Sequence, residues 1–117
     1  MAMPVSRELE AYIVGQLEAS GTVTSKRMFG GVGLYLGGVF CGIIGPDSGL
    51  LYLKVDDSNR KDYEREGMEP FRTPKGTLSY YTVPQHVLED SELLQEWALK
   101  ARAVALSKPV GRRKNRK

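Results

Sequence analysis

Alternating apolar and small residues form the clearest pattern in this chain, and the pattern runs from Lys26 to Val55. Within it, Gly37-Gly38 stands between two apolar runs. Both glycines can adopt a positive φ without a steric clash, which favours a two-residue β-hairpin turn. Such a turn sets the register of the two strands, and it predicts the opposed pairs Leu36 and Val39, Tyr35 and Phe40, Leu34 and Cys41, and Gly33 and Gly42.

Successive side chains of a strand point to opposite faces of a sheet, so this register, together with a pairing of Ile44 with Leu50 across the Gly45–Gly49 loop, predicts two different faces. The first face is apolar and should be covered by helices; its predicted members are Val32, Leu34, Leu36, Val39, Cys41, Ile43, Leu51, Leu53 and Val55. The second face combines aromatic rings with glycines; its predicted members are Gly33, Tyr35, Phe40, Gly42, Ile44, Leu50, Tyr52 and Lys54. This arrangement places the Tyr52 ring over Gly33 and Gly42.

Helical spacing of apolar residues, together with capping residues, predicts three helices, at Ser6–Ala19, Asp56–Gly67 and Ser91–Leu106. The predicted N-caps are Ser6 for the first helix, Asp57 or Ser58 for the second, and Asp90 or Ser91 for the third. A first strand begins near Ser25, with a bulge or bend at Gly30-Gly31. Two later strands, around Phe71 and over Leu78–Val83, flank a turn at Thr73–Gly76.

The predicted order is helix, three strands, helix, two strands, helix. This order predicts an α+β fold, in which helices cover one face of a five-stranded, mostly antiparallel sheet. With 117 residues the chain is expected to form one folded domain, over residues 1–106, followed by a basic and flexible tail at residues 107–117.

Positive charge is concentrated at the C-terminal end of the sequence. The net charge is +3, but the last ten residues contain six Lys or Arg and no acid, so the remainder is net negative. Attraction to nucleic acid is therefore expected mainly from the tail, through Arg112, Arg113, Lys114, Arg116 and Lys117. The single cysteine, and the absence of a signal-like or membrane-spanning apolar run, predict a cytoplasmic protein.

Several residue types that often carry chemistry have a structural explanation here. Cys41 is expected in the core, where a desolvated thiol resists ionisation. His86 has no partner at the spacing of a zinc site or catalytic dyad. The glycines near Gly30 match no phosphate-binding motif, and the acids around the middle helix interleave with Arg and Lys as on a solvated helix surface. The sequence predicts no catalytic residue, metal ion or cofactor.

The second sheet face is the strongest candidate for function. We do not expect three helices to cover both faces, and an apolar surface of this kind is costly to leave in water. The candidate binding residues are Tyr35, Phe40, Tyr52, Lys54, Arg27 and Tyr81. Three occupants remain open: a helix or the tail of the same chain, a second copy of the chain, or another protein or small ligand.

Four segments are similar, in order and spacing, to the N-terminal domain of TfoX-type proteins: RMFGGVGLYLGGVFCGII, LYLKVDDSNRKDYEREGMEPF, LSYYTVPQHVLED and ELLQEWALKARAVA. The resemblance covers roughly Val23 to Leu106. The family is named for regulators of bacterial natural competence, and the resemblance implies an α+β fold like that of secretion chaperones. The competence regulators carry a second, helical domain after this one, whereas this sequence ends in the basic tail and resembles a single-domain member.

We therefore expect a non-enzymatic binding or regulatory module that acts through protein–protein contacts, as a homodimer or with another protein, and not at a membrane. The alternative is a DNA-associated transcriptional regulator that uses the basic tail. A small-molecule-binding protein or an enzyme is a third possibility.

Overall fold

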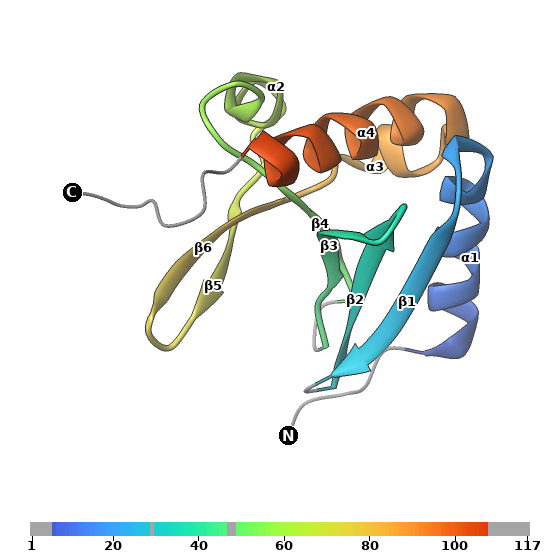
Figure 1. Cartoon of the computed structure of the whole chain (residues 1–117). Helices are drawn as coiled ribbons and strands as arrows, with labels where there is room; N and C mark the ends of the chain where they lie inside the picture. The colour runs from blue at the N-terminus through green and yellow to red at the C-terminus, as the bar shows by residue number, and fades with distance from the viewer. Residues whose placement is uncertain (1–5, 29, 47–48, 108–117) are drawn as a thin grey trace.

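Six antiparallel strands and a set of helices make up the fold, shown in Figure 1. The computed structural model describes residues 6–28, 30–46 and 49–107, and the side chain of Ser20 is not described. The elements are α1 (Arg7–Leu17), η1 (Glu18–Ser20), β1 (Val23–Met28), β2 (Gly31–Leu36), β3 (Val39–Ile44), β4 (Leu51–Lys54), α2 (Arg60–Arg65), β5 (Pro70–Thr73), β6 (Gly76–Thr82), α3 (Gln85–Leu88) and α4 (Ser91–Ser107). The strands lie in the order β1-β2-β3-β4-β6-β5.

The predicted α+β class is confirmed, with six strands where the sequence predicted five. The predicted first strand, with its bend at Gly30-Gly31, is in fact the hairpin of β1 and β2. Gly30 has a φ of +81°, which suits a turn. A Cβ added to Gly31 would lie 2.7 Å from the carbonyl oxygen of Ile44, so this close approach requires glycine.

The register of the β2–β3 hairpin is confirmed next to its turn and wrong farther along. Leu36 faces Val39 and Tyr35 faces Phe40, as predicted. Beyond these pairs a β-bulge shifts the register by one residue, so Leu34 faces Gly42 instead of Cys41. Two residues of β3 then oppose one residue of β2, which is the defining feature of a bulge.

The bulge exchanges the predicted faces of two isoleucines. Cys41 is fully buried, and a Cβ added to Gly42 would meet Leu34 and Leu53 on the same, core-facing side. Ile44 is therefore in the core, at 0% exposure, whereas Ile43 points to the other face. The sequence placed these two residues the other way round. It also placed Gly42 on the second face, which is wrong for the same reason.

The core lies between the sheet and the helices α1 and α4, which contact each other as well as the strands (Figure 1). Its fully buried members include Ile13, Leu17, Leu34, Cys41, Ile44, Leu53, Leu94, Ala98 and Ala101. Two predicted N-caps are confirmed, because Ser6 accepts a hydrogen bond from the Leu9 amide and Asp90 accepts one from the Leu93 amide. Among the described helices, none combines the length and apolar character that crossing a bilayer requires.

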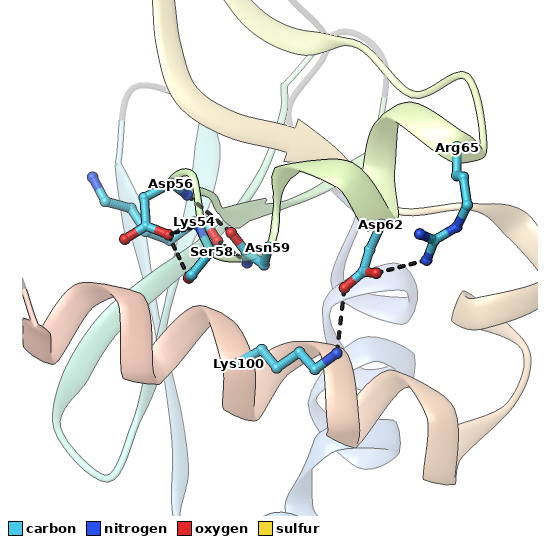
Figure 2. Close-up of polar contacts among 7 residues, drawn as sticks. All are labelled: Lys54, Asp56, Ser58, Asn59, Asp62, Arg65 and Lys100. Carbon is cyan, nitrogen blue, oxygen red and sulfur yellow. Dashed lines mark hydrogen bonds and ion pairs between the residues drawn. The ribbon is translucent and has the colours of Figure 1, made fainter.

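The connection from β4 to α2 is held chiefly by Asn59, which the sequence did not single out (Figure 2). The Asn59 carboxamide accepts a hydrogen bond from the Asp56 amide (2.9 Å) and donates one to the Lys54 carbonyl (3.1 Å). Asn59 itself is only 3% exposed. The Asp56 carboxylate in turn accepts hydrogen bonds from the amide and hydroxyl of Ser58.

The predicted N-cap of this helix is wrong as a result. α2 begins at Arg60, after Asn59 at the cap position, and not after Asp57 or Ser58. Asn59 makes no capping hydrogen bond to its own helix, because its side chain is directed back to β4. The polar groups at this junction thus fix where the helix leaves the sheet.

Candidate binding face

The sheet face turned away from α1 and α4, here called the open face, gathers aromatic and aliphatic side chains from five strands and Lys54. Its members are Met28, Gly33, Tyr35, Phe40, Ile43, Tyr52, Lys54, Leu78 and Tyr80. The sequence placed five of these residues on the second face: Gly33, Tyr35, Phe40, Tyr52 and Lys54.

One row of this face crosses four strands. The ring centroids of Tyr35 and Phe40 are 5.2 Å apart, and those of Phe40 and Tyr80 are 5.9 Å apart. The Lys54 ammonium nitrogen lies 4.9 Å from the centroid of the Tyr80 ring, within the range of a cation–π contact. The predicted row of Tyr35, Phe40 and Lys54 is therefore confirmed, and Tyr80 extends it.

The open face is concave, as shown by a cavity that is lined jointly by strands that lie far apart in the sheet. β1 and β6 are separated in the sheet by three strands, yet Met28 of β1 and Leu78 of β6 line the same pocket. The sheet is thus curled, and the β5–β6 hairpin, yellow at the lower left of Figure 1, contributes Phe71 and Leu78 to one wall. This cavity, here called the apolar pocket, has a volume of about 260 Å³ and is lined by Met28, Gly31, Val32, Gly33, Phe40, Ile43, Pro46, Phe71 and Leu78.

A larger and more polar cavity of about 650 Å³ lies beside the apolar pocket and shares Pro46 and Phe71 with it. The Tyr52 ring lies on this side, 4.7 Å from the ring of Phe71. Glu69 and Arg72 also line the larger cavity, and they form an ion pair at 3.6 Å. The two cavities are therefore neighbours, with Pro46 and Phe71 lining both.

The predicted partner of the Tyr52 ring is wrong, because the bulge places Ile43, not Gly42, between Gly33 and Tyr52. Gly33 serves a different purpose. A Cβ at Gly33 would come within 2.9 Å of the Phe40 ring and 2.8 Å of the Met28 methyl group. Glycine therefore leaves the space that these two side chains occupy where they line the apolar pocket.

Two predicted binding residues lie on the opposite, helix-covered side of the sheet. Arg27 forms an ion pair of 3.1 Å with Glu10 of α1. Tyr81 packs with its ring centroid 5.8 Å from that of Tyr63, a fully buried residue of α2. Grouping Arg27 and Tyr81 with Lys54 was therefore incorrect. The tail residues Arg112, Arg113, Lys114, Arg116 and Lys117 lie outside the residues that the structure describes.

Comparison with known families agrees with this architecture. The family model of the TfoX N-terminal domain matches residues 15–105 of the 117 in this chain. The chain belongs to the TfoX N-terminal domain family. The family is one of regulatory domains of the competence-regulator type and is not a known enzyme family. A search of curated proteins finds no match to this chain.

Burial keeps Cys41, Tyr63 and Tyr80 of this TfoX N-terminal domain in their neutral forms. Burial raises the pKa of the Cys41 thiol to about 11 and that of the Tyr80 hydroxyl to about 12. Burial also raises the pKa of Tyr63, whose hydroxyl has no hydrogen-bond partner among the described residues. The core position predicted for Cys41 is confirmed, and a thiol in this state is a poor nucleophile.

Three acids around α2 of the TfoX N-terminal domain form ion pairs: Asp57, Asp62 and Glu66. Asp57 pairs with Arg60, and Glu66 lies 3.2 Å from His86. The Asp62 carboxylate contacts Arg65 at 2.7 Å and Lys100 of α4 at 3.3 Å (Figure 2).

Burial opposes the ionisation of Asp62, but the hydrogen bonds from Arg65 and Lys100 outweigh it and lower the pKa of the carboxyl group. Within the described ranges, no three His, Cys, Asp or Glu side chains gather as a metal site.

Proposed function

We propose that this TfoX N-terminal domain is a non-enzymatic regulatory module of the cytoplasm that acts by binding another protein through its open face. The observation that carries the proposal is the apolar pocket, whose rim includes the 42%-exposed side chain of Leu78. Apolar concavities of this kind are typical of sites for a partner's side chains. The regulatory type of the family supports the same reading.

The sequence also allowed a second copy of the chain as the partner. Lys26 is exposed on the open face, so two copies joined through these faces would each bring this cation to the interface. Like charges placed opposite each other weaken an interface and suppress that pairing. We therefore propose a partner that is a different protein, and light scattering of the purified chain should give the mass of a monomer.

Site-specific photocrosslinking tests this proposal. A benzophenone amino acid placed at Leu78 should give defined crosslinked products with a partner protein in cells. The same amino acid at Leu106, which is 58% exposed on α4, should not give these products. Both positions are exposed leucines, so the pair differs in location and not in accessibility. Equal products from both positions, or products that contain only the chain itself, would contradict a foreign partner at the open face.

The second candidate function, contact with DNA, is favoured by the charge of the tail. Six cations in the last ten residues can neutralise up to six phosphates. Each neutralised phosphate contributes about −0.9 to the slope of log K against log salt, so the slope would approach about −5. Deleting residues 108–117 should then abolish retention on duplex DNA at low salt. Retention that is unchanged by the deletion, or undetectable with the tail present, would exclude this role for the tail.

A further inference from the structure

The outer half of the β5–β6 hairpin, residues 72–79, is here called the arm, and it extends away from the other strands (Figure 1). β6 pairs with β4 over residues 80–82, and the Ser79 carbonyl accepts one further hydrogen bond from the Val55 amide. From residue 72 to residue 78 the described strand pairs join β5 to β6 alone. None of the eight residues of the arm is buried, and seven of them are exposed. The arm is therefore attached to the sheet at one end only.

The tip of the arm is stiff. The Thr73 hydroxyl donates a hydrogen bond to the Gly76 carbonyl at 2.8 Å and accepts one from the Lys75 amide at 3.2 Å. These two bonds close the turn, and the pairs Arg72 with Thr77 and Thr73 with Gly76 join the two strands beside it. Because these contacts lie within the arm, the arm can move as a unit without losing them.

Both strands of the hairpin change in character at the base of the arm. In β5 the pairing with β6 is irregular between Pro70 and Arg72, and proline has no backbone N–H to donate. In β6 the contact with β4 ends at Ser79, next to the buried residue Tyr80. Local stability is low where buried apolar contacts are few and the backbone hydrogen bonds are exposed to solvent. These two positions are therefore where the arm can bend.

The arm carries part of one wall of the apolar pocket. Leu78, which is 42% exposed, lines the pocket from the arm, and Phe71 lines it from the base of the arm. Met28, Phe40 and Ile43 line it from β1 and β3. Because the walls belong to two parts of the molecule that are joined at the hinge, bending of the arm changes the width of the pocket.

We propose that the arm is a lid that closes over an apolar side chain of the partner when this side chain enters the apolar pocket. A side chain in the pocket contacts Leu78 and the strands of the sheet together, so it holds the arm in the closed position. Closure buries more of Leu78, and the burial of apolar surface is favourable. This inference rests on the proposed function and adds how the open face admits and retains its partner.

Double electron–electron resonance with spin labels measures the motion of the arm in the full chain. Labels at Lys26→Cys of β1 and Lys75→Cys of the arm give the distance across the open face. Labels at Lys26→Cys and Glu96→Cys of α4 form the control pair, and all three positions are exposed. The native Cys41 is fully buried, so it should remain unlabelled. The arm pair should give a broader distribution of distances than the control pair.

A neutral apolar dye, N-phenyl-1-naphthylamine, takes the place of the partner's side chain in a second measurement. Saturating dye should narrow the distribution of the arm pair and shift it to shorter distances, and it should leave the control pair unchanged. Leu78→Glu should weaken binding of the dye by about tenfold or more and abolish this shift. Leu106→Glu makes the same change on the helix side and should alter neither result. Circular dichroism should confirm that both variants stay folded.

The remaining outcomes overturn the proposal. Equal widths for the two pairs in the free chain would show that the arm does not move. Dye binding that depends on Leu78 but leaves the arm-pair distances unchanged would show a pocket without a lid. If no dye binds, or if the shift persists in Leu78→Glu, the motion is not coupled to the apolar pocket. None of these results depends on a foreign partner, so the photocrosslinking experiment decides the proposed function separately.

Discussion

Ile44→Ala should lower the free energy of unfolding by about 2–5 kcal/mol, whereas Ile43→Ala should lower it by about 1 kcal/mol. Ile44 is completely buried between the sheet and the helices, so truncation leaves a cavity that the core cannot fill. Ile43 borders the apolar pocket, where one side of its surface already lacks packed neighbours. Urea denaturation of the two variants, followed by tryptophan fluorescence, measures the difference.

These two adjacent residues have the same chemistry and the same strand, so each serves as the control for the other. An unshifted hairpin, with Leu34 opposite Cys41, would reverse the order and make Ile43→Ala the costlier change. That reversed result would show that β3 has no bulge at Cys41. Comparable losses at both positions would mean that the two faces of the sheet are equally well covered.

Asn59→Ala should destabilise the protein by about 2 kcal/mol, although it removes few apolar contacts. The substitution leaves the Asp56 amide and the Lys54 carbonyl without their partner, in a place where Asn59 is almost fully enclosed. An enclosed polar group without a hydrogen bond costs about 1–3 kcal/mol. Thermal unfolding monitored by circular dichroism would show the loss as a lower midpoint temperature.

Two further variants separate the hydrogen bonds of Asn59 from its volume. Asn59→Asp preserves the shape and the acceptor for the Asp56 amide, but it loses the donor to Lys54 and adds a charge, so it should also destabilise. Ser58→Ala, at an exposed neighbouring position, should cost much less. A stability of Asn59→Ala close to that of the native chain would show that water replaces the amide, and that the junction of β4 and α2 does not depend on it.

Much of the fold follows from local signals in the sequence. The glycine pair at 37 and 38 fixes the hairpin turn and the first two cross-strand pairs, and Ser6 and Asp90 mark the starts of their helices. The bulge could not be predicted in the same way. Because Ile43 and Ile44 are identical and both apolar, alternation is satisfied whichever one faces the core. The structure places Ile44 in the core, where β3 packs against α4, a contact between distant parts of the chain that the local pattern does not contain.

The residues of the candidate site could be predicted only in strands where the sequence shows which side chains point to which face of the sheet. Tyr35 and Phe40 follow directly from the turn at residues 37 and 38. Lys54 was placed through the predicted pairing of Ile44 with Leu50, which is wrong because Ile44 pairs with Leu51; this shift and the shift at the bulge cancel, so Lys54 still lies on the predicted face. In β6 two tyrosines are adjacent, and the sequence alone does not say which one points to the open face; the structure assigns Tyr80. Phe71 and Leu78 reach the apolar pocket through the curl of the whole sheet, which no local pattern encodes.

The strand order places β1 and β5 at the two margins of the sheet, where unpaired backbone groups could recruit strands from other molecules. Each of these two edge strands has a feature that opposes pairing with a strand of another molecule. β1 has adjacent cations at Lys26 and Arg27, and β5 starts with Pro70 and is irregular before Arg72. The adjacent charges of Lys26 and Arg27 thus disfavour the addition of a strand from a neighbouring chain along the β1 edge, which would otherwise lead to aggregation.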